Sequence, residues 1–161
     1  MPAEVRSPAD AGAAVDQVDV RGPRFTAWVT TAVLALALFV SSGSPAAAAA
    51  ILGVQAVVFA IGALGGPRSH PYGLVFAGLV APRLAPVTEK EPVPPLKFAQ
   101  LVGFVFAVVG TAGFAAGIST LGLVATGLAL VAAFLNAAFA ICLGCQLYPL
   151  IARLRRSRIS A

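Results

Sequence analysis

Apolar residues fill two long stretches of the chain, and polar residues collect before, between and after them. No Asp, Glu, Lys or Arg occurs from Phe25 to Pro67 or from Phe98 to Ala152. A transmembrane helix needs about 20 apolar residues, so each stretch is long enough for two spans and a tight turn. Runs such as AVLALALFV lack the alternation of a membrane β-strand. Because backbone groups in lipid must pair internally, the pattern predicts helices.

Turn residues divide each apolar stretch and define four predicted spans. Ser41–Pro45 interrupts the first stretch, and Gly117–Thr120 interrupts the second. The predicted fold class is therefore an all-α membrane protein whose four transmembrane helices form two helical hairpins. The predicted spans cover residues 25–42, 46–64, 98–118 and 121–143.

The polar segments surround a predicted transmembrane domain at residues 21–152. Residues 1–20 have no helical stripe and are predicted to form a disordered cytoplasmic tail. The cytoplasmic loop, 65–97, contains an apolar run at residues 74–84 that is too short to span and predicts a short interfacial helix. The Pro-rich sequence after that run predicts an extended connector. Residues 153–161 form a basic cytoplasmic tail.

The first apolar run has an alternative interpretation as a signal peptide. Arg21 and Arg24 precede it, and the sequence SSGSPAAAAA after it resembles a cleavage site. Cleavage there would remove the start of the second predicted span, and the tail before the run is long for a signal. We therefore expect the first span to be retained.

Composition and charge support a bilayer as the principal partner. The chain is 59% hydrophobic and 11% charged, with a mean hydropathy of +0.92, whereas soluble domains carry about 25% charged residues. The basic residues fall in three separate segments, which argues against nucleic-acid binding. The four-span arrangement puts all 11 Lys and Arg on one side. The positive-inside rule then predicts a multi-pass cell-membrane protein with cytoplasmic N- and C-termini.

The sequence Cys142-Leu143-Gly144-Cys145 contains both cysteines of the chain. Residues three apart share a helix face, and a disulfide can close where a helix opens or is distorted, which Gly144 permits. The pair follows the fourth predicted span and so lies near the cytoplasmic interface. Arg153 and Arg155 lie beyond it, and positive charge favours the nucleophilic thiolate. Cys142 and Cys145 are therefore candidate catalytic residues, as a redox dithiol.

Other interpretations of the pair involve packing or metal binding. Buried cysteines often act as small hydrophobic residues. Haem attachment requires C-x-x-C-H, but Gln146 follows here. A zinc site needs two further ligands, so only a homodimer sharing four thiolates leaves it open. We expect no cofactor, and we interpret His70, the only histidine, as an interfacial turn residue.

Three polar residues lie within the apolar stretches: Gln55, Gln100 and Asn136. Such residues face the interior of a helical bundle, where they either bond to neighbouring helices or line a polar path for a small solute. Four glycines have the small-xxx-small spacing that permits close helix approach, namely Gly62 with Gly66 and Gly113 with Gly117.

The order of several motifs resembles a bacterial, mainly actinobacterial, membrane family named domain of unknown function 4395. The resemblance covers about residues 19 to 152 and rests on RGPRF at Arg21–Phe25, PYG at Pro71–Gly73, Pro82-Arg83, KFAQ at Lys97–Gln100, FLNAAF at Phe134–Phe139 and CLGC at Cys142–Cys145. Members often lie in gene neighbourhoods with thioredoxin-like proteins and rhodanese-type sulfurtransferases. The resemblance implies thiol or sulfur chemistry near the membrane, without a known reaction.

The favoured hypothesis is thiol redox or sulfur handling at the cytoplasmic membrane face through Cys142 and Cys145. One alternative is a channel or carrier for a small sulfur species. Another is a non-catalytic scaffold for a rhodanese-type sulfurtransferase or thioredoxin-like soluble partner. A homodimer remains open, and no nucleic-acid partner is expected.

Overall fold

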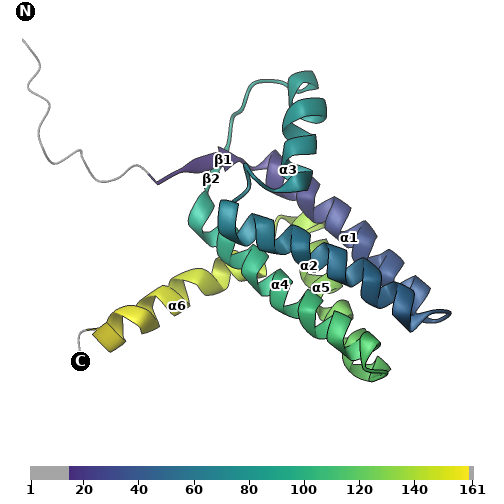
Figure 1. Ribbon diagram of the computed structural model, residues 1–161. Coiled ribbons are helices and arrows are strands. Elements are labelled where there is room, and N and C mark those ends of the chain that lie inside the picture. The colour runs from purple at the N-terminus through teal and green to yellow at the C-terminus, as the bar shows by residue number, and fades with distance from the viewer. Residues whose placement is uncertain (1–14, 160–161) are drawn as a thin grey trace, which may run out of the picture.

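Four long helices form two hairpins that pack into a bundle (Figure 1). The computed structural model describes residues 15–159. The first hairpin consists of α1 (Arg21–Ser41) and α2 (Pro45–Gly65), and the second of α4 (Val93–Ala115) and α5 (Ser119–Phe139). Helix α2 packs against α4 and α1 against α5, which closes the ring. All four are long and apolar enough to cross a membrane, so the predicted fold class is confirmed.

The outer turns of the hairpins contain residues suited to stop one helix and begin the next. The Ser44 hydroxyl accepts a hydrogen bond from the Ala47 N–H, and Pro45 occupies the first helical position. In the second hairpin Gly117 adopts a φ of +75°, a conformation that glycine tolerates at little cost. Both predicted turns are present, and they lie at the same end of the bundle (Figure 1).

Helix α4 begins five residues before the predicted span. The Pro-rich stretch is extended only as far as Pro92, and Val93 starts the helix. Pro94 and Pro95 lie in the first helical turn, where backbone N–H groups have no intrahelical partner. The prolines therefore begin a helix instead of extending a connector.

A short strand pair joins the starts of the two hairpins. Strand β1 (Gln17–Asp19) pairs antiparallel with β2 (Lys90–Pro92), with Val18 opposite Glu91. Residues 1–14 of the predicted tail lie outside the described residues, whereas the end of that tail forms β1. The pairing was not foreseen from the sequence, and it holds the beginnings of α1 and α4 side by side.

A charge pair stabilises the junction between β1 and α1. The Arg21 guanidinium donates to both carboxylate oxygens of Asp19, at 2.7–3.0 Å, and to the Ala85 carbonyl at 3.0 Å. The hydrogen bond from Arg21 lowers the pKa of Asp19 below its usual value, although burial opposes the shift. These contacts attach the loop between the hairpins to the first helix.

The predicted short helix between the hairpins is present. It begins as α3 (Pro71–Val75), continues as a π-helical turn at Phe76–Val80 and ends as a 3₁₀ turn at Ala81–Arg83. Phe76 is buried against α1, where its ring lies 5.8 Å from that of Phe25. The segment therefore packs on the bundle and is not a free loop.

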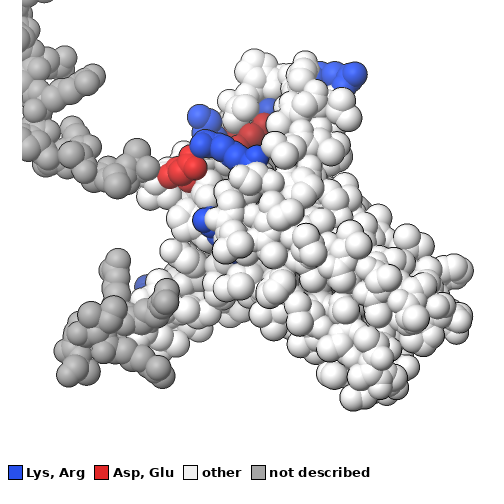
Figure 2. All heavy atoms as spheres, in the orientation of Figure 1, with Lys and Arg blue, Asp and Glu red and all other residues white. Residues whose placement is uncertain are grey.

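Apolar side chains fill the part of the bundle interior near the outer turns, and they also cover the outer surface of the bundle. Leu34, Leu52 and Phe114 belong to one buried cluster. On the outer surface Phe39 and Leu64 are 79% and 80% exposed, which lipid accommodates and water does not. In Figure 2 the charged side chains gather around the strand pair and the neighbouring helix ends, and the rest of the visible bundle is uncharged. The protein is therefore a multi-pass membrane protein.

The four glycines with small-xxx-small spacing have two different roles. A Cβ on Gly113 would lie 2.6 Å from the backbone nitrogen of Gly122, so this glycine lets α4 and α5 meet backbone to backbone. Gly62 makes similar room for the His70 ring. Gly66 and Gly117 instead occupy turns with positive φ. Only one glycine of each pair therefore supports close packing.

We predict that Gly113→Ala lowers the free energy of unfolding in detergent by about 1–3 kcal/mol, because the methyl group must push the helices apart. Gly127→Ala on α5 is the matched control, since a Cβ there has no atom within 4 Å. Because alanine has a higher helix propensity than glycine, this control should leave the free energy of unfolding unchanged or raise it by up to about 1 kcal/mol. Equal stability of the two variants in thermal or SDS unfolding would contradict the close approach.

Candidate functional site

Helix α5 ends before the cysteines, although the fourth span was predicted to continue to residue 143. Ala140 adopts a left-handed conformation, with φ +57° and ψ 26°, and its N–H bonds to the Asn136 carbonyl. For a residue with a Cβ this conformation costs about 1–2 kcal/mol. The break moves residues 140–142 out of the helix and changes the surroundings of the cysteine pair.

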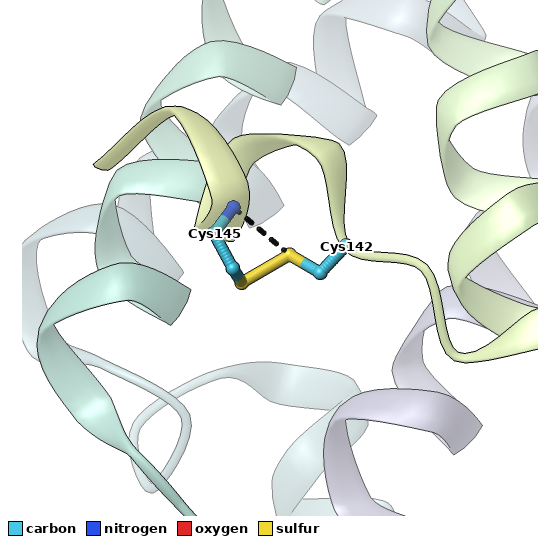
Figure 3. Close-up of a disulfide and its surroundings, with 2 residues drawn as sticks. All are labelled: Cys142 and Cys145. Atoms are coloured by element: carbon cyan, nitrogen blue, oxygen red, sulfur yellow. Dashed lines mark hydrogen bonds between the residues drawn. A yellow bond between two sulfur atoms is a disulfide. The ribbon is translucent and has the colours of Figure 1, made fainter. Parts of the chain in front are cut away.

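Cys142 and Cys145 form a disulfide at the first turn of a separate helix, α6 (Leu143–Ile159) (Figure 3). Their Cα atoms are 5.2 Å apart, and the Cys142 Sγ accepts a hydrogen bond from the Cys145 N–H at 3.2 Å. Cys142 therefore lies where a helix N-cap residue lies, with its sulfur in the place of a capping oxygen. The positive end of a helix dipole favours a thiolate at this position.

The beginning of α6 packs directly on α4. A Cβ on Gly144 would lie 2.6 Å from the Ala99 Cα, so only glycine allows this approach. The Phe98 and Tyr148 rings meet 6.1 Å apart a turn further along. The sequence predicts Gly144 as a residue that permits a helix distortion around the disulfide. In the structure its contact with Ala99 also holds the cysteine pair against the bundle.

The basic residues of α6 lie too far along the helix to account for thiolate stabilisation. Arg153 is eight residues after Cys145, which corresponds to about 12 Å of helical rise. This exceeds the Debye length of about 8 Å at physiological salt. The side chain of Arg155 lies outside the described part of the structure. The N-terminal end of α6 is a source of positive potential in direct contact with the Cys142 sulfur.

A cavity of about 290 Å³ lies beside the disulfide, between α1, α4 and α5. The first turn of α6 contributes Cys142 to its lining, and most of the other lining residues are apolar. Thr30, Gln100 and Asn136 add polar groups from three different helices. Two of the polar residues found in the apolar stretches therefore meet the cysteine pair at one site.

A second polar cluster adjoins the cavity through Gln100. The Tyr72 hydroxyl donates to the Gln55 Oε1 at 2.8 Å, and the Tyr72 N–H donates to the His70 Nδ1 at 3.3 Å. His70 lies in the turn before α3, as we expected, but its side chain is only 1% exposed, which the sequence did not indicate. The absence of a side chain on Gly62 leaves the space that the His70 ring occupies. Sequence reasoning missed this buried position because the clue, a glycine eight residues earlier, was assigned to helix packing.

Burial lowers the pKa of His70 to about 4, and the neighbouring Gln100 amide opposes the shift. The His70 Nε2 and Gln100 Oε1 atoms are both buried without a hydrogen-bond partner. The imidazole is therefore neutral in the folded protein at neutral pH.

We predict that His70 makes the protein less stable as the pH falls from about 6.5 to about 4. In this window the unfolded chain protonates the imidazole and the folded protein does not, which costs roughly 3 kcal/mol by the lower end. His70→Asn keeps a capping acceptor but cannot titrate, and it should lose less stability. Unfolding in detergent at several pH values measures the difference. Parallel pH profiles for the two proteins would contradict the burial of a neutral His70.

Within residues 15–159, no three His, Cys, Asp or Glu side chains come together to hold a metal ion. The zinc site shared between two copies of the chain remains a prediction.

Comparison with known proteins identifies the family of the chain. No curated protein and no solved structure matches it. A family model described as a domain of unknown function, number 4395, matches residues 18–153. This range includes all four long helices, nearly all of the strand pair and the cysteine pair. The chain therefore belongs to the membrane family known as domain of unknown function 4395.

Proposed function

We propose that this protein is a membrane thiol-redox protein whose Cys142–Cys145 pair cycles between disulfide and dithiol. The observation that carries the proposal is the position of the Cys142 sulfur at the N-terminus of α6, bonded to the Cys145 N–H. A cysteine that only fills apolar space needs no such position. Both side chains are half-buried, so a partner's thiol has access to the disulfide.

The position of each cysteine suggests a different role. A thiolate at Cys142 gains the Cys145 N–H and the positive end of α6, so Cys142 is the better nucleophile and leaves readily from a mixed disulfide with the partner. A partner thiolate attacks the Cys142 sulfur, and Cys145 leaves as a thiolate. The second partner thiolate then attacks its own sulfur in the mixed disulfide and releases Cys142. Two electrons and two protons pass from the partner dithiol to the cysteine pair.

The proposed location of this chemistry is the cytoplasmic face of the membrane. The described Lys and Arg residues, from Arg21 to Arg153, belong to the helix ends and loops opposite the two outer turns. Arg24 extends from α1 to the Ala137 carbonyl near the end of α5, at 3.4 Å, which adds positive charge at this face. Cytoplasmic loops are enriched in such residues. A soluble thioredoxin-like or rhodanese-type protein is the partner class that this location suits.

The carrier and scaffold alternatives predict different behaviour. A carrier needs a path through the bundle, but the buried cluster around Leu34, Leu52 and Phe114 fills the half beyond the cavity. A scaffold keeps its function without either cysteine. Thiol redox and persulfide transfer both require Cys142, and they differ in whether the partner delivers electrons or a sulfur atom.

We predict that Cys145→Ser accumulates a mixed disulfide between Cys142 and the oxidised form of its partner. The Cys142 thiolate attacks the partner's disulfide in the reverse of the reaction above, and the Cys145 thiol that would resolve the adduct is absent. Cys142→Ser should give far less, since Cys145 lacks the helix N-cap position. Non-reducing gels after acid trapping of intact cells would reveal the adduct, with the double Cys→Ser variant as control. Normal function of the double variant in cells would support the scaffold instead.

We predict that a reporter fused after Ala161 is active as a cytoplasmic reporter. The expectation follows from the confinement of the described basic residues to one end of the bundle. A second fusion in the turn at Ser42–Ser44 should behave as an external reporter and serves as the control. Activity of a periplasmic-type reporter at the C-terminus would overturn the proposed orientation.

A further inference from the structure

The cavity beside the disulfide offers a place where a membrane-soluble molecule could take electrons from the reduced cysteine pair. It lies within the ring of membrane helices, and Cys142 forms part of its wall. Its volume is about 290 Å³, and a water molecule occupies about 30 Å³ of liquid. The space therefore suits the head group of a single-ring molecule of roughly ten non-hydrogen atoms.

Thr30 supplies a hydrogen-bonding group that has no partner within the protein. The residue is only 3% exposed, and its Oγ1 is buried without a hydrogen-bond partner. Three other helical threonines, Thr31, Thr111 and Thr126, each donate to the carbonyl four residues earlier. A buried unpaired hydroxyl costs about 1–3 kcal/mol, so an occupant of the cavity that bonds to Thr30 gains from the contact.

Gln100 adds a second polar residue to the cavity lining. Its amide also neighbours His70, and the Gln100 Oε1 is buried without a hydrogen-bond partner. Thr30 lies on α1 and Gln100 on α4, so the polar residues of the lining come from different helices. The polar groups of the cavity thus match a flat, mostly apolar molecule with polar atoms at two edges.

We propose that the cavity binds the head group of an isoprenoid quinone, which accepts the electrons of the Cys142–Cys145 dithiol. This inference rests on the proposed thiol-redox function and names its electron acceptor. Oxidation of a dithiol releases two electrons and two protons, and a quinone takes up both. A quinone also dissolves in the bilayer, has apolar faces and presents two carbonyl oxygens that can accept from Thr30 and the cavity amides.

The transfer balances without any further reactant. The Cys142 thiolate adds to a ring carbon and forms a carbon–sulfur bond, while the electron pair moves onto a ring oxygen. The Cys145 thiolate then attacks the Cys142 sulfur, which forms the disulfide and breaks the carbon–sulfur bond. Both electrons remain on the ring, and the two thiol protons convert it to the quinol. The quinol hydroxyls can then donate to the unpaired Gln100 Oε1.

The direct test uses reduced full-length protein in lipid nanodiscs, freed of reductant and mixed anaerobically with decylubiquinone or a short-chain menaquinone. Quinol formation is followed by ultraviolet absorbance, and thiols are counted by maleimide labelling. One quinol should appear for each disulfide formed. The double Cys→Ser variant should form no quinol but should still bind the quinone saturably in equilibrium dialysis.

Matched variants test whether the cavity is the site. Thr30→Val removes the unpaired hydroxyl and should slow quinol formation at least tenfold, whereas Thr31→Val on the same helix should react at the wild-type rate. Ala132→Leu fills the cavity from α5 and should abolish saturable binding. Ala112→Leu places the same side chain on an exposed face of α4 and should not. Wild-type rates in both cavity variants would overturn the assignment of the site.

The outcomes separate this inference from the proposed function. Exchange with a soluble dithiol protein in the absence of any quinol formation would overturn the quinone as acceptor and leave the thiol-redox function standing. Failure of both cysteines to label or exchange under reducing conditions would overturn the proposed function itself.

Discussion

In a bilayer, backbone N–H and C=O groups outside a helix need hydrogen bonds from water or other polar groups, so non-helical segments are confined to places where such groups are present. This constraint determines where chemistry can occur. The outer turns are short: Ser44 caps the first turn of α2, and Gly117 adopts the positive φ that the second turn requires. The irregular segments are all at the opposite end, where the strand pair, the loop between the hairpins and the break at Ala140 gather. The cysteine pair belongs to this end because α5 stops there. Had the helix continued through Cys145, the sulfurs would lie on a helix face without the N-terminal donor that Cys142 now has.

The sequence allowed the membrane architecture to be predicted because its signals are local. Charge-free stretches and turn residues define spans, and the short helix between the hairpins follows from an apolar run of limited length. The strand pair could not be predicted, since it depends on hydrogen bonds between residues more than seventy positions apart. The end of α5 could not be predicted either. Ala140 is a good helix former, so its left-handed conformation is not a local preference. It occurs where the chain turns to bring Gly144 against Ala99 of α4.

The candidate site was predictable as a pair of residues but not as an environment. The CxxC spacing identified Cys142 and Cys145, and the polar residues Gln100 and Asn136 were expected to face the bundle interior. That these groups line a common cavity depends on the fold of α6 back onto α4, which no periodicity reveals. The effect of the helix dipole on the cysteine pair also differs from the one that the sequence predicted. A helix C-terminus would disfavour a thiolate, whereas the N-terminus of α6 favours it.

The two hairpins are built alike, yet the segments that follow them create different interiors. After α2 the chain turns inward and buries His70, which stays neutral and bonds through Nδ1 to the Tyr72 N–H. After α5 it turns inward with the cysteine pair, which borders open space. Gln100 lies between these two arrangements, close to His70 and also in the cavity wall. Any group that enters the cavity and bonds to Gln100 must therefore compete with, or complete, the polar cluster around His70. The close contacts of Gly62 with His70 and of Gly144 with Ala99 hold both segments against the bundle.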